Sequence, residues 1–393
     1  MKFLIVTYAP TLKKEDKFYS YAPYVYEMNV WSKHITKLGV ISPISYENEL
    51  LLSAFTTNPK IFPIKSISFV SIKSSLISFF RIPLILIKLF RAMQWADHIH
   101  LRCPGNIGLL GSLVQIFFKS KPKTVKYAGN WDPKSKQPLS YRFQKWILSN
   151  TFLTRNTKVL VYGDWPDQTK NIIPFFTASY SENEIEVINF EERLMSLRKA
   201  CTEHSRSTQS DKCCINFIFV GALSNGKQPM LSVKVVQALK DKGYQVRLDL
   251  YGEGGERSRI ENYIDKYDLQ NEVILHGNVS KDIVKKAYQK SHFLLFISKS
   301  EGWPKVVAEA MIWGCLPITS SVSCTPFMLA EGMRGGLVSE NKDEVVAKIE
   351  SYISNVVKYQ SQSQEAMKWS RQFTLEKFEI EIGKLINSPL ERG

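Results

Sequence analysis

Short apolar runs alternate with longer amphipathic segments along almost the whole chain. In the first half, the apolar runs are Phe3–Thr7, His98–Leu101, Thr124–Tyr127 and Lys158–Tyr162. Runs this short and this continuous are typical of strands buried in a parallel sheet, and the segments between them are long enough for crossover helices. The pattern therefore predicts an α/β protein with helices on both faces of a parallel sheet.

A polar, charged stretch at residues 191–212 interrupts this alternation and predicts a linker. The alternation then resumes, with apolar runs at Asn216–Val220, Gln245–Tyr251, Val273–His276 and Phe293–Ile297. We therefore predict two doubly wound, Rossmann-like domains at residues 1–190 and 213–370. Residues 371–393 are expected to form a last helix that returns to the first domain. Ligands of such sheets bind beyond the carboxyl ends of the strands, so a ligand is expected in a cleft that the two domains face.

Composition narrows the class of protein. The chain has 393 residues, 44% of them hydrophobic, which excludes wholesale disorder. Its six cysteines form no C-x-x-C pair, which argues against a zinc ribbon or a disulfide scaffold and favours a reducing compartment. The first residues do not resemble a signal peptide, and no stretch reaches the ~18 uncharged apolar residues of a spanning helix. We expect a cytoplasmic protein that could also bind peripherally to the inner face of the membrane.

Residues 300–311, Ser-Glu-Gly-Trp-Pro-Lys-Val-Val-Ala-Glu-Ala-Met, carry the sharpest chemical signal. Gly302 and Pro304 indicate a tight turn, and a helix is expected to begin just after it. The free amides at a helix N-terminus bind anions such as a diphosphate. Glu301 and Glu309 flank this turn, so both carboxylates could reach one ligand, and carboxylates hold sugar and ribose hydroxyls. The spacing alone equally allows that Glu301 only offsets the helix dipole and that Glu309 is a surface residue.

Several segments, in this order, resemble the retaining glycosyltransferases of family 4, which belong to the glycosyl transferases group 1 and have the GT-B fold. They are Phe219-Val220-Gly221 followed by Lys227, Tyr251-Gly252-Glu253-Gly254, His276-Gly277-Asn278-Val279, Glu301-Gly302-Trp303-Pro304, Glu309-Ala310-Met311, and Gly314-Cys315-Leu316-Pro317. The resemblance is good from Asn216 to Val338 and extends over the first half only in outline. It implies a GT-B protein that uses a nucleotide-diphosphate sugar.

The resemblance also implies roles for individual residues. Glu301 would hold the donor sugar, Glu309 the ribose, and Lys227 the diphosphate. The other implied donor-binding residues are Gly221, Gly252, Glu253, Val279, Gly302, Trp303, Pro304, Lys305 and Val306. A fixed cation and a helix N-terminus can stabilise the departing diphosphate. No metal and no other cofactor is expected, and the chain contains no Asp-x-Asp pair.

Two positions depart from the family pattern. Ala222 stands where the family usually has an arginine, so one of two phosphate cations is missing, and Lys305 could replace it. Gln228 stands where a glycine is expected after the lysine. These departures leave open a slow or degenerate enzyme, and Lys227 could also be an ordinary loop lysine.

The first half of the chain is expected to bind the acceptor, which we predict to be lipid-linked or a saccharide. The family often has a catalytic histidine after a strand here, and the aligned residue could be His100 or Arg102, although His100 also fits a packed strand position. Tyr21, Asn130 and Asp132 are the candidate acceptor-binding residues. For the tyrosine, simple packing under a loop is an equally good interpretation.

The chain has a net charge of +15, and its basic residues are not evenly spread along the sequence. Residues 50–96 contain no Asp or Glu, yet on a helix Lys73, Arg81, Lys88 and Arg91 would fall within an arc of about 80° among apolar side chains. This pattern suits an anionic membrane surface. It also fits a core helix with a solvated basic edge.

The leading hypothesis is a retaining, metal-independent hexosyl- or similar transferase in cell-surface polysaccharide synthesis. One alternative is a nucleotide-sugar epimerase on the same fold. Another is a non-catalytic basic protein that binds a membrane or nucleic acid. We expect no nucleic-acid partner, because the basic residues lie among aliphatic side chains and no nucleic-acid-binding motif is present.

Overall fold

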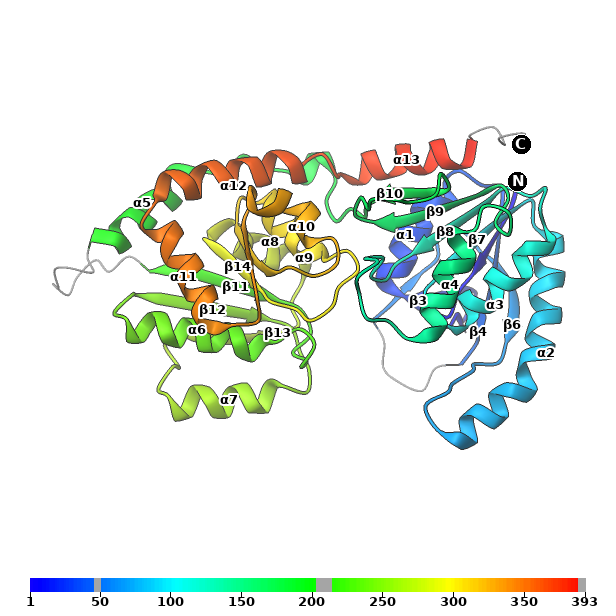
Figure 1. The fold of residues 1–393 in the computed structure, drawn as a ribbon, viewed down its shortest axis with the longest axis horizontal. Helices are drawn as coiled ribbons and strands as arrows, with labels where there is room; N and C mark the ends of the chain where they lie inside the picture. Colours follow the sequence, from blue (N-terminus) through cyan, green and yellow to red (C-terminus); the bar gives the residue numbers. More distant parts are fainter. Residues whose placement is uncertain (46–50, 203–213, 388–393) are drawn as a thin grey trace. The chain divides into compact units, whose positions relative to one another are not determined.

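The computed structural model describes residues 1–45, 51–202 and 214–387. The chain forms two compact units (Figure 1). Unit 1 contains Met1–Phe176 and Lys377–Gly393, and unit 2 contains Thr177–Glu376. The sequence pattern placed the boundary at residue 190, but it lies earlier, because the segment after Phe176 already contacts helices of unit 2 through pairs such as Ser179 with Glu309 and Glu184 with Lys281.

Unit 1 is built on a seven-stranded parallel sheet in the order β10-β9-β8-β7-β1-β4-β6. Its strands are β1 (Lys2–Val6), β4 (Lys37–Pro43), β6 (Lys60–Ile64), β7 (His98–Cys103), β8 (Lys123–Tyr127), β9 (Thr157–Tyr162) and β10 (Ile172–Phe175). A small antiparallel sheet contains β2 (Leu12–Lys14), β3 (Lys17–Tyr21) and β5 (Leu52–Ala54). The central strands are buried on both faces, as the continuous apolar runs predicted.

The crossover helices of unit 1 are α1 (Ala22–Ser32), α2 (Ile72–Trp95), α3 (Asn106–Val114) and α4 (Leu139–Ser149). A core cluster joins the sheet to α2 and α3 and includes Leu4, Leu89, Ile99, Ile107 and Val125. None of the helices in the described part of the chain is both long and apolar enough to cross a membrane.

Helix α2 continues through Pro83, which lies inside it. Ser71 begins it with a capping box shared with Ser74. At the other end, the Lys121 ammonium donates to the carbonyl oxygens of Met93 and Gln94, at 2.9 Å each. These bonds satisfy carbonyls that have no partner within the helix, so the end of α2 is fixed to the sheet.

Unit 2 has a six-stranded parallel sheet in the order β13-β12-β11-β14-β15-β16. Its strands are β11 (Ile215–Val220), β12 (Val246–Tyr251), β13 (Val273–Gly277), β14 (Phe293–Phe296), β15 (Leu316–Ser320) and β16 (Gly336–Val338). The strand order reverses between β11 and β14. In open α/β sheets the loops at such a switch point form the ligand site.

The helices of unit 2 are α5 (Phe190–Thr202), α6 (Pro229–Asp241), α7 (Arg257–Lys266), α8 (Lys281–Lys290), α9 (Lys305–Ile312), α10 (Thr325–Met328), α11 (Lys342–Ile353) and α12 (Val356–Ser370). Helix α5 corrects the predicted linker. Arg193, Leu194 and Leu197 are buried, and the Arg193 guanidinium donates to the carbonyl of Trp313 at 3.1 Å. The rest of the predicted linker, 203–212, lies outside the described residues.

Helix α13 (Leu375–Asn387) occupies the segment predicted at 371–393. From Lys377 onward the chain belongs to unit 1. The Phe378 ring lies 5.6 Å from that of Phe175 and 5.7 Å from that of Phe176, and Phe378 is only 2% exposed. The amphipathic face of the helix therefore completes the packing at the β10 edge of the first sheet.

Candidate active site

The loops that follow β11, β12 and β13 are joined by backbone hydrogen bonds. The Gly221 amide donates to the Tyr251 carbonyl at 2.9 Å, the Leu223 amide to the Glu253 carbonyl at 2.9 Å, and the Gly252 amide to the Gly277 carbonyl at 2.8 Å. These loops form one continuous platform at the carboxyl ends of the strands, where a ligand of a doubly wound sheet binds.

Glycine is required where two of these loops touch. A Cβ atom on Gly252 would lie 2.0 Å from the Gly221 carbonyl oxygen, and the φ angle of Gly252 is +136°. A side chain cannot fit at that distance, and the backbone conformation is one that favours glycine. The predicted site residues Gly221 and Gly252 therefore set the close approach of two loops.

Lys227 and Glu301 meet at the switch point. The Lys227 Nζ atom lies 2.5 Å from Glu301 Oε1 and 5.1 Å from the centre of the Phe296 ring. The two side chains are 30% and 7% exposed, respectively. The loop after β11 thus supplies a cation, and the loop after β14 supplies its carboxylate partner. Two residues singled out from the sequence are in direct contact.

Other contacts, which the sequence did not indicate, hold these two loops. The Lys299 amide donates to the Gly226 carbonyl at 2.9 Å, and the Ser298 hydroxyl donates to the same oxygen at 3.1 Å. The Ser323 hydroxyl donates to the Gly302 carbonyl at 3.1 Å. Single serines in loops give no sequence signal of this kind, because their partners are backbone atoms of distant segments.

Helix α9 begins directly after this turn, with Pro304 as its N-cap. The first amides of a helix, here those of Lys305 and Val306, have no acceptor within the helix and carry the positive end of the dipole. The half-buried Lys305 side chain adds a second cation at this end. The structure thus confirms that a helix begins directly after the Gly302–Pro304 turn, and its use as an anion site stays a prediction.

The Trp303 side chain packs away from these amides. It is 8% exposed, and its ring lies 5.9 Å from the Phe373 ring and 6.3 Å from the Trp369 ring. Among the residues predicted to bind the donor, Trp303 therefore has a packing role for its side chain. Only its backbone lies in the turn.

Glu309 faces a different set of partners from Glu301. The Ser179 hydroxyl donates to Glu309 Oε1 at 2.5 Å. Burial raises the pKa of the Tyr288 phenol on α8 well above its usual value, and the negative charge of Glu309 is the second cause of this rise. The two carboxylates thus have different partners, Lys227 for Glu301 and Ser179 with Tyr288 for Glu309. The sequence did not indicate Ser179 or Tyr288.

Two further predicted donor residues lie on the platform. The Glu253 carboxylate accepts from the guanidinium of Arg257, the first residue of α7, at 2.5 Å. Val279 is half-buried in the short loop between β13 and α8. Both follow the carboxyl ends of their strands, as their motifs predicted.

His100 does not reach a ligand. It is fully buried within β7, where its Nδ1 atom lies 2.9 Å from the Thr124 hydroxyl and its ring lies 4.6 Å from that of Trp31. Burial, with the nearby charge of Arg102, lowers the pKa of His100 well below its usual range and keeps the ring neutral. The catalytic prediction for His100 is therefore wrong, because this strand is buried on both faces.

Arg102 lies nearer the carboxyl end of the same strand and is partly exposed. Its guanidinium donates to Glu27 Oε2 at 3.2 Å and stacks on the Tyr24 ring at 4.7 Å. Of the two alternatives that the sequence left open, Arg102 is the one whose side chain lies outside the core of the sheet.

The candidate acceptor residues are separate features of unit 1. Tyr21 is 43% exposed and precedes α1. Asn130 and Asp132 lie in the loop after β8, where the Asn130 side chain accepts from the Asp132 amide at 2.9 Å and the Asp132 side chain accepts from the Lys134 amide at 2.8 Å. Such side-chain bonds shape turns.

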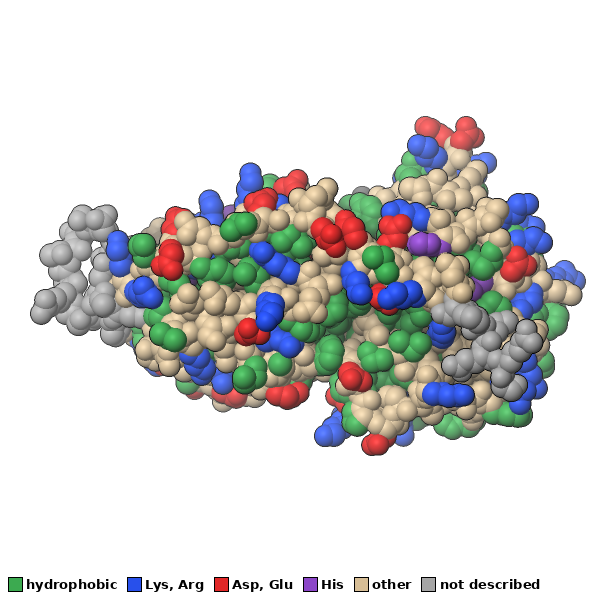
Figure 2. All heavy atoms as spheres, turned by 90° about the horizontal axis from the view of Figure 1, so that it is seen from above, with side chains coloured by type: hydrophobic (Ala, Val, Ile, Leu, Met, Phe, Trp, Pro, Cys, Tyr) green, Lys and Arg blue, Asp and Glu red, His purple; other side chains and the backbone are tan. Residues whose placement is uncertain are grey.

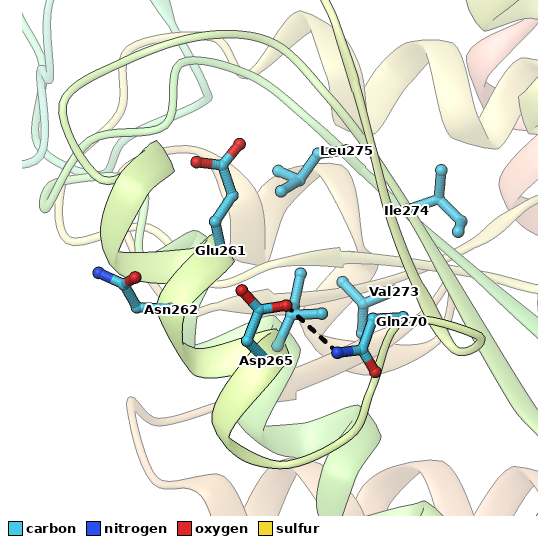
Figure 3. Close-up of a pocket in the computed structure, with 8 residues that line it drawn as sticks. Glu261, Asn262, Asp265, Gln270, Val273, Ile274 and Leu275 are labelled. Atoms are coloured by element: carbon cyan, nitrogen blue, oxygen red, sulfur yellow. Dashed lines mark hydrogen bonds between the residues drawn. The ribbon is translucent and has the colours of Figure 1, made fainter.

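A shallow pocket of about 510 Å³ lies elsewhere on unit 2 (Figure 3). It is lined by residues of α7 and β13, including Glu261, Asp265 and Ile274. None of the predicted donor-binding residues lines it. Within the described residues, no cluster of three or more His, Cys, Asp or Glu side chains has the geometry to hold a metal ion.

Residues 202–369 match the family model "Glycosyl transferases group 1". An uncharacterized glycosyltransferase of Methanocaldococcus jannaschii is 28% identical over 170 residues, which are 43% of this chain and 46% of that protein. A putative colanic acid biosynthesis glycosyltransferase, WcaL of Salmonella typhimurium, is 27% identical over 36% of each chain. These alignments span about half the length of these relatives or less.

Solved structures match over the whole chain. The lipopolysaccharide outer core galactosyltransferase WaaB, in its apo form, has a TM-score of 0.67 at 16% identity and covers 99% of both chains. The Anabaena protein HepE in complex with UDP and glucose has a TM-score of 0.64 at 15% identity, covering 99% of this chain and 100% of that one. The fold is GT-B. The family model matches the part of the chain that holds most of unit 2, and the solved structures show the fold of the whole chain.

Proposed function

We propose that this chain is a retaining glycosyltransferase that moves a sugar from a nucleotide-diphosphate donor to a lipid-linked or saccharide acceptor in cell-surface polysaccharide synthesis. The observation that carries the proposal is the contact of Lys227 with Glu301 beside the free amides at the start of α9. A cation, a carboxylate and a helix N-terminus are the groups that a nucleotide sugar needs at its diphosphate and its sugar.

In the proposed reaction, the bond from the sugar's anomeric carbon to the diphosphate oxygen breaks, and a bond to the acceptor oxygen forms on the same face. Negative charge grows on the departing diphosphate, and Lys227 with the α9 amides stabilises it. The acceptor's proton passes to an oxygen of that diphosphate. Glu301 holds hydroxyls of the sugar and Glu309 those of the ribose, at opposite ends of the diphosphate.

The departures from the family pattern fit this proposal. Lys305, the first residue of α9, supplies the second cation in place of the arginine that Ala222 replaces. Two fixed cations and a helix N-terminus offset the diphosphate charge, so we propose that no metal ion is needed. The family model and the relative that this chain matches are those of glycosyltransferases, and no observation favours an epimerase or a nucleic-acid-binding protein.

The test is a titration of the protein with UDP, GDP and ADP by isothermal calorimetry, followed by a transfer assay with the matching sugar nucleotides and a membrane-lipid extract as acceptor. We expect one nucleoside diphosphate to bind, and transfer to continue in the presence of a chelator. The absence of binding to all three would remove the transferase proposal, whereas loss of transfer on chelation would contradict only the metal-free mechanism.

A further inference from the structure

Helix α2 presents a second apolar face that the fold of unit 1 does not use. Its inner face is buried against the sheet through Ile85, Leu89 and Met93, each at most 2% exposed. The outer face carries six large hydrophobic side chains that are 50% to 92% exposed. They are Ile72, Leu76, Phe79, Phe80, Leu84 and Ile87. A contiguous apolar surface of this size marks a binding site rather than scattered exposure.

Exposed apolar side chains continue past both ends of this set of six. Phe69 and Val70, just before α2, are 49% and 95% exposed. Near its other end, the Phe90 ring lies 6.4 Å from that of Phe117, which is 76% exposed. We call this set of exposed side chains, from Phe69 to Phe90 together with Phe117, the α2 surface. Helix α2 lies along one side of unit 1, and its first turns extend past the neighbouring elements (Figure 1).

The charge around the α2 surface has one sign. Lys73 and Arg91 are exposed on the helix, and Lys65 is exposed just before it. Arg81 and Lys88 donate to the backbone carbonyls of Ser66 and Pro63, at 2.9 Å and 2.7 Å, so they hold the helix to the preceding segment. From Leu50 to Ala96 the sequence contains no acidic residue that could offset these cations.

We infer that the α2 surface binds the interface of an anionic lipid bilayer. Exposed aliphatic and phenyl side chains can enter the acyl boundary, while the flanking cations meet the lipid phosphates. A second copy of this chain fits less well, because a self-pairing α2 surface would bring its cations against each other without acidic partners. Figure 2 shows basic, acidic and hydrophobic side chains intermixed on the one face of the molecule that it draws.

The inference does not depend on glycosyl transfer, and its test uses no sugar. The full chain is mixed with vesicles of pure phosphatidylcholine or of phosphatidylcholine with about one third phosphatidylglycerol, and binding is measured by flotation. We expect the wild type to partition at least about tenfold more strongly onto the anionic vesicles, and this preference to shrink as salt is added.

Two pairs of substitutions separate the contributions. Lys73→Gln with Arg91→Gln should lower binding to anionic vesicles by about 25-fold, since one cation at such a surface is worth a factor of about five. Phe79→Ser with Phe80→Ser should lower it by more than about tenfold. These side chains are exposed, so circular dichroism and the thermal midpoint should match the wild type.

The controls remove one cation and one exposed apolar side chain elsewhere on unit 1. Lys37→Gln removes an exposed cation at the start of β4, and Ile380→Ser removes a side chain on α13 that is 54% exposed. Both should bind vesicles within about twofold of the wild type. The inference is overturned if the wild type binds both vesicles equally or neither. It is also overturned if the α2 variants bind like the controls, or if light scattering shows a dimer that Phe79→Ser with Phe80→Ser converts to a monomer.

Discussion

Glu301→Gln should have opposite effects on nucleotide binding and on turnover. In the free protein the Glu301 carboxylate forms an ion pair with the Lys227 ammonium, with 2.5 Å between Oε1 and Nζ. A nucleoside diphosphate without its sugar needs that ammonium but makes no use of the carboxylate. The amide of Gln keeps the shape of the side chain and removes its charge, so it releases Lys227 for the diphosphate.

The magnitude follows from the burial of the pair. Lys227 is 30% exposed and Glu301 is 7% exposed. Exposed ion pairs are worth up to about 1 kcal/mol and buried ones several. A half-buried pair of about 1.4 kcal/mol corresponds to about tenfold tighter binding of the free nucleoside diphosphate. Turnover should fall by about a hundredfold or more, because the charged partner of the donor sugar is lost.

Isothermal calorimetry with whichever of UDP, GDP and ADP the wild type binds best measures the first effect, and initial rates of transfer measure the second. Glu350→Gln is a matched control, because its carboxylate pairs with Lys242 at 2.7 Å on another face of unit 2. It should change neither quantity. If Glu301→Gln leaves nucleotide affinity unchanged or weakens it, the carboxylate does not compete for Lys227 and the assignment of the pair is wrong.

Three further predictions concern unit 2. Gln228→Gly should stabilise the protein by about 1 kcal/mol in urea denaturation, since φ is +50° there and, among the described residues, its buried amide nitrogen has no acceptor; an unchanged midpoint would show that the loop carries no strain. Gly252→Ala should destabilise unit 2 by about 3 kcal/mol or more and weaken nucleotide binding. Gly255→Ala is the control and should do neither, because its Cβ atom would meet nothing within 4 Å. Equal effects of the two substitutions would rule out the predicted clash. Burial lowers the pKa of His292 to about 3, so only the unfolded chain gains a proton as the pH falls from about 6.5 towards 3, and stability falls with it. His292→Gln should therefore reduce the acid slope of the unfolding free energy by about 1.4 kcal/mol per pH unit, and an unaltered slope would show that this ring titrates normally in the folded protein.

The sequence predicted the alternation of strands and helices well, because parallel strands buried on both faces leave unbroken apolar runs. The same property explains the error at His100. A central strand such as β7 has no solvent face, so a polar residue in its sequence does not indicate exposure. The predicted linker failed for a related reason. Most residues of α5 are polar, and the helix is anchored through the buried side chains of Arg193, Leu194 and Leu197.

The candidate site could be predicted only where a turn and a helix start were close in sequence. The segment from Glu301 to Glu309 met this condition, and Lys227 was found through its resemblance to a family motif. Ser179 could not be found, because it lies 130 residues from Glu309 and a single serine carries no pattern. Distant partners of this kind are set by tertiary packing rather than by local sequence.

The connectivity of the two units has a consequence for biosynthesis. Unit 2 is one uninterrupted stretch of chain, whereas unit 1 draws its last helix from beyond it. A ribosome therefore releases every residue of unit 2 before Phe378 emerges to cover Phe175 and Phe176. Until that moment the β10 edge of the first sheet keeps its phenyl rings unprotected, so the nascent amino-terminal unit is the one that needs shielding from aggregation.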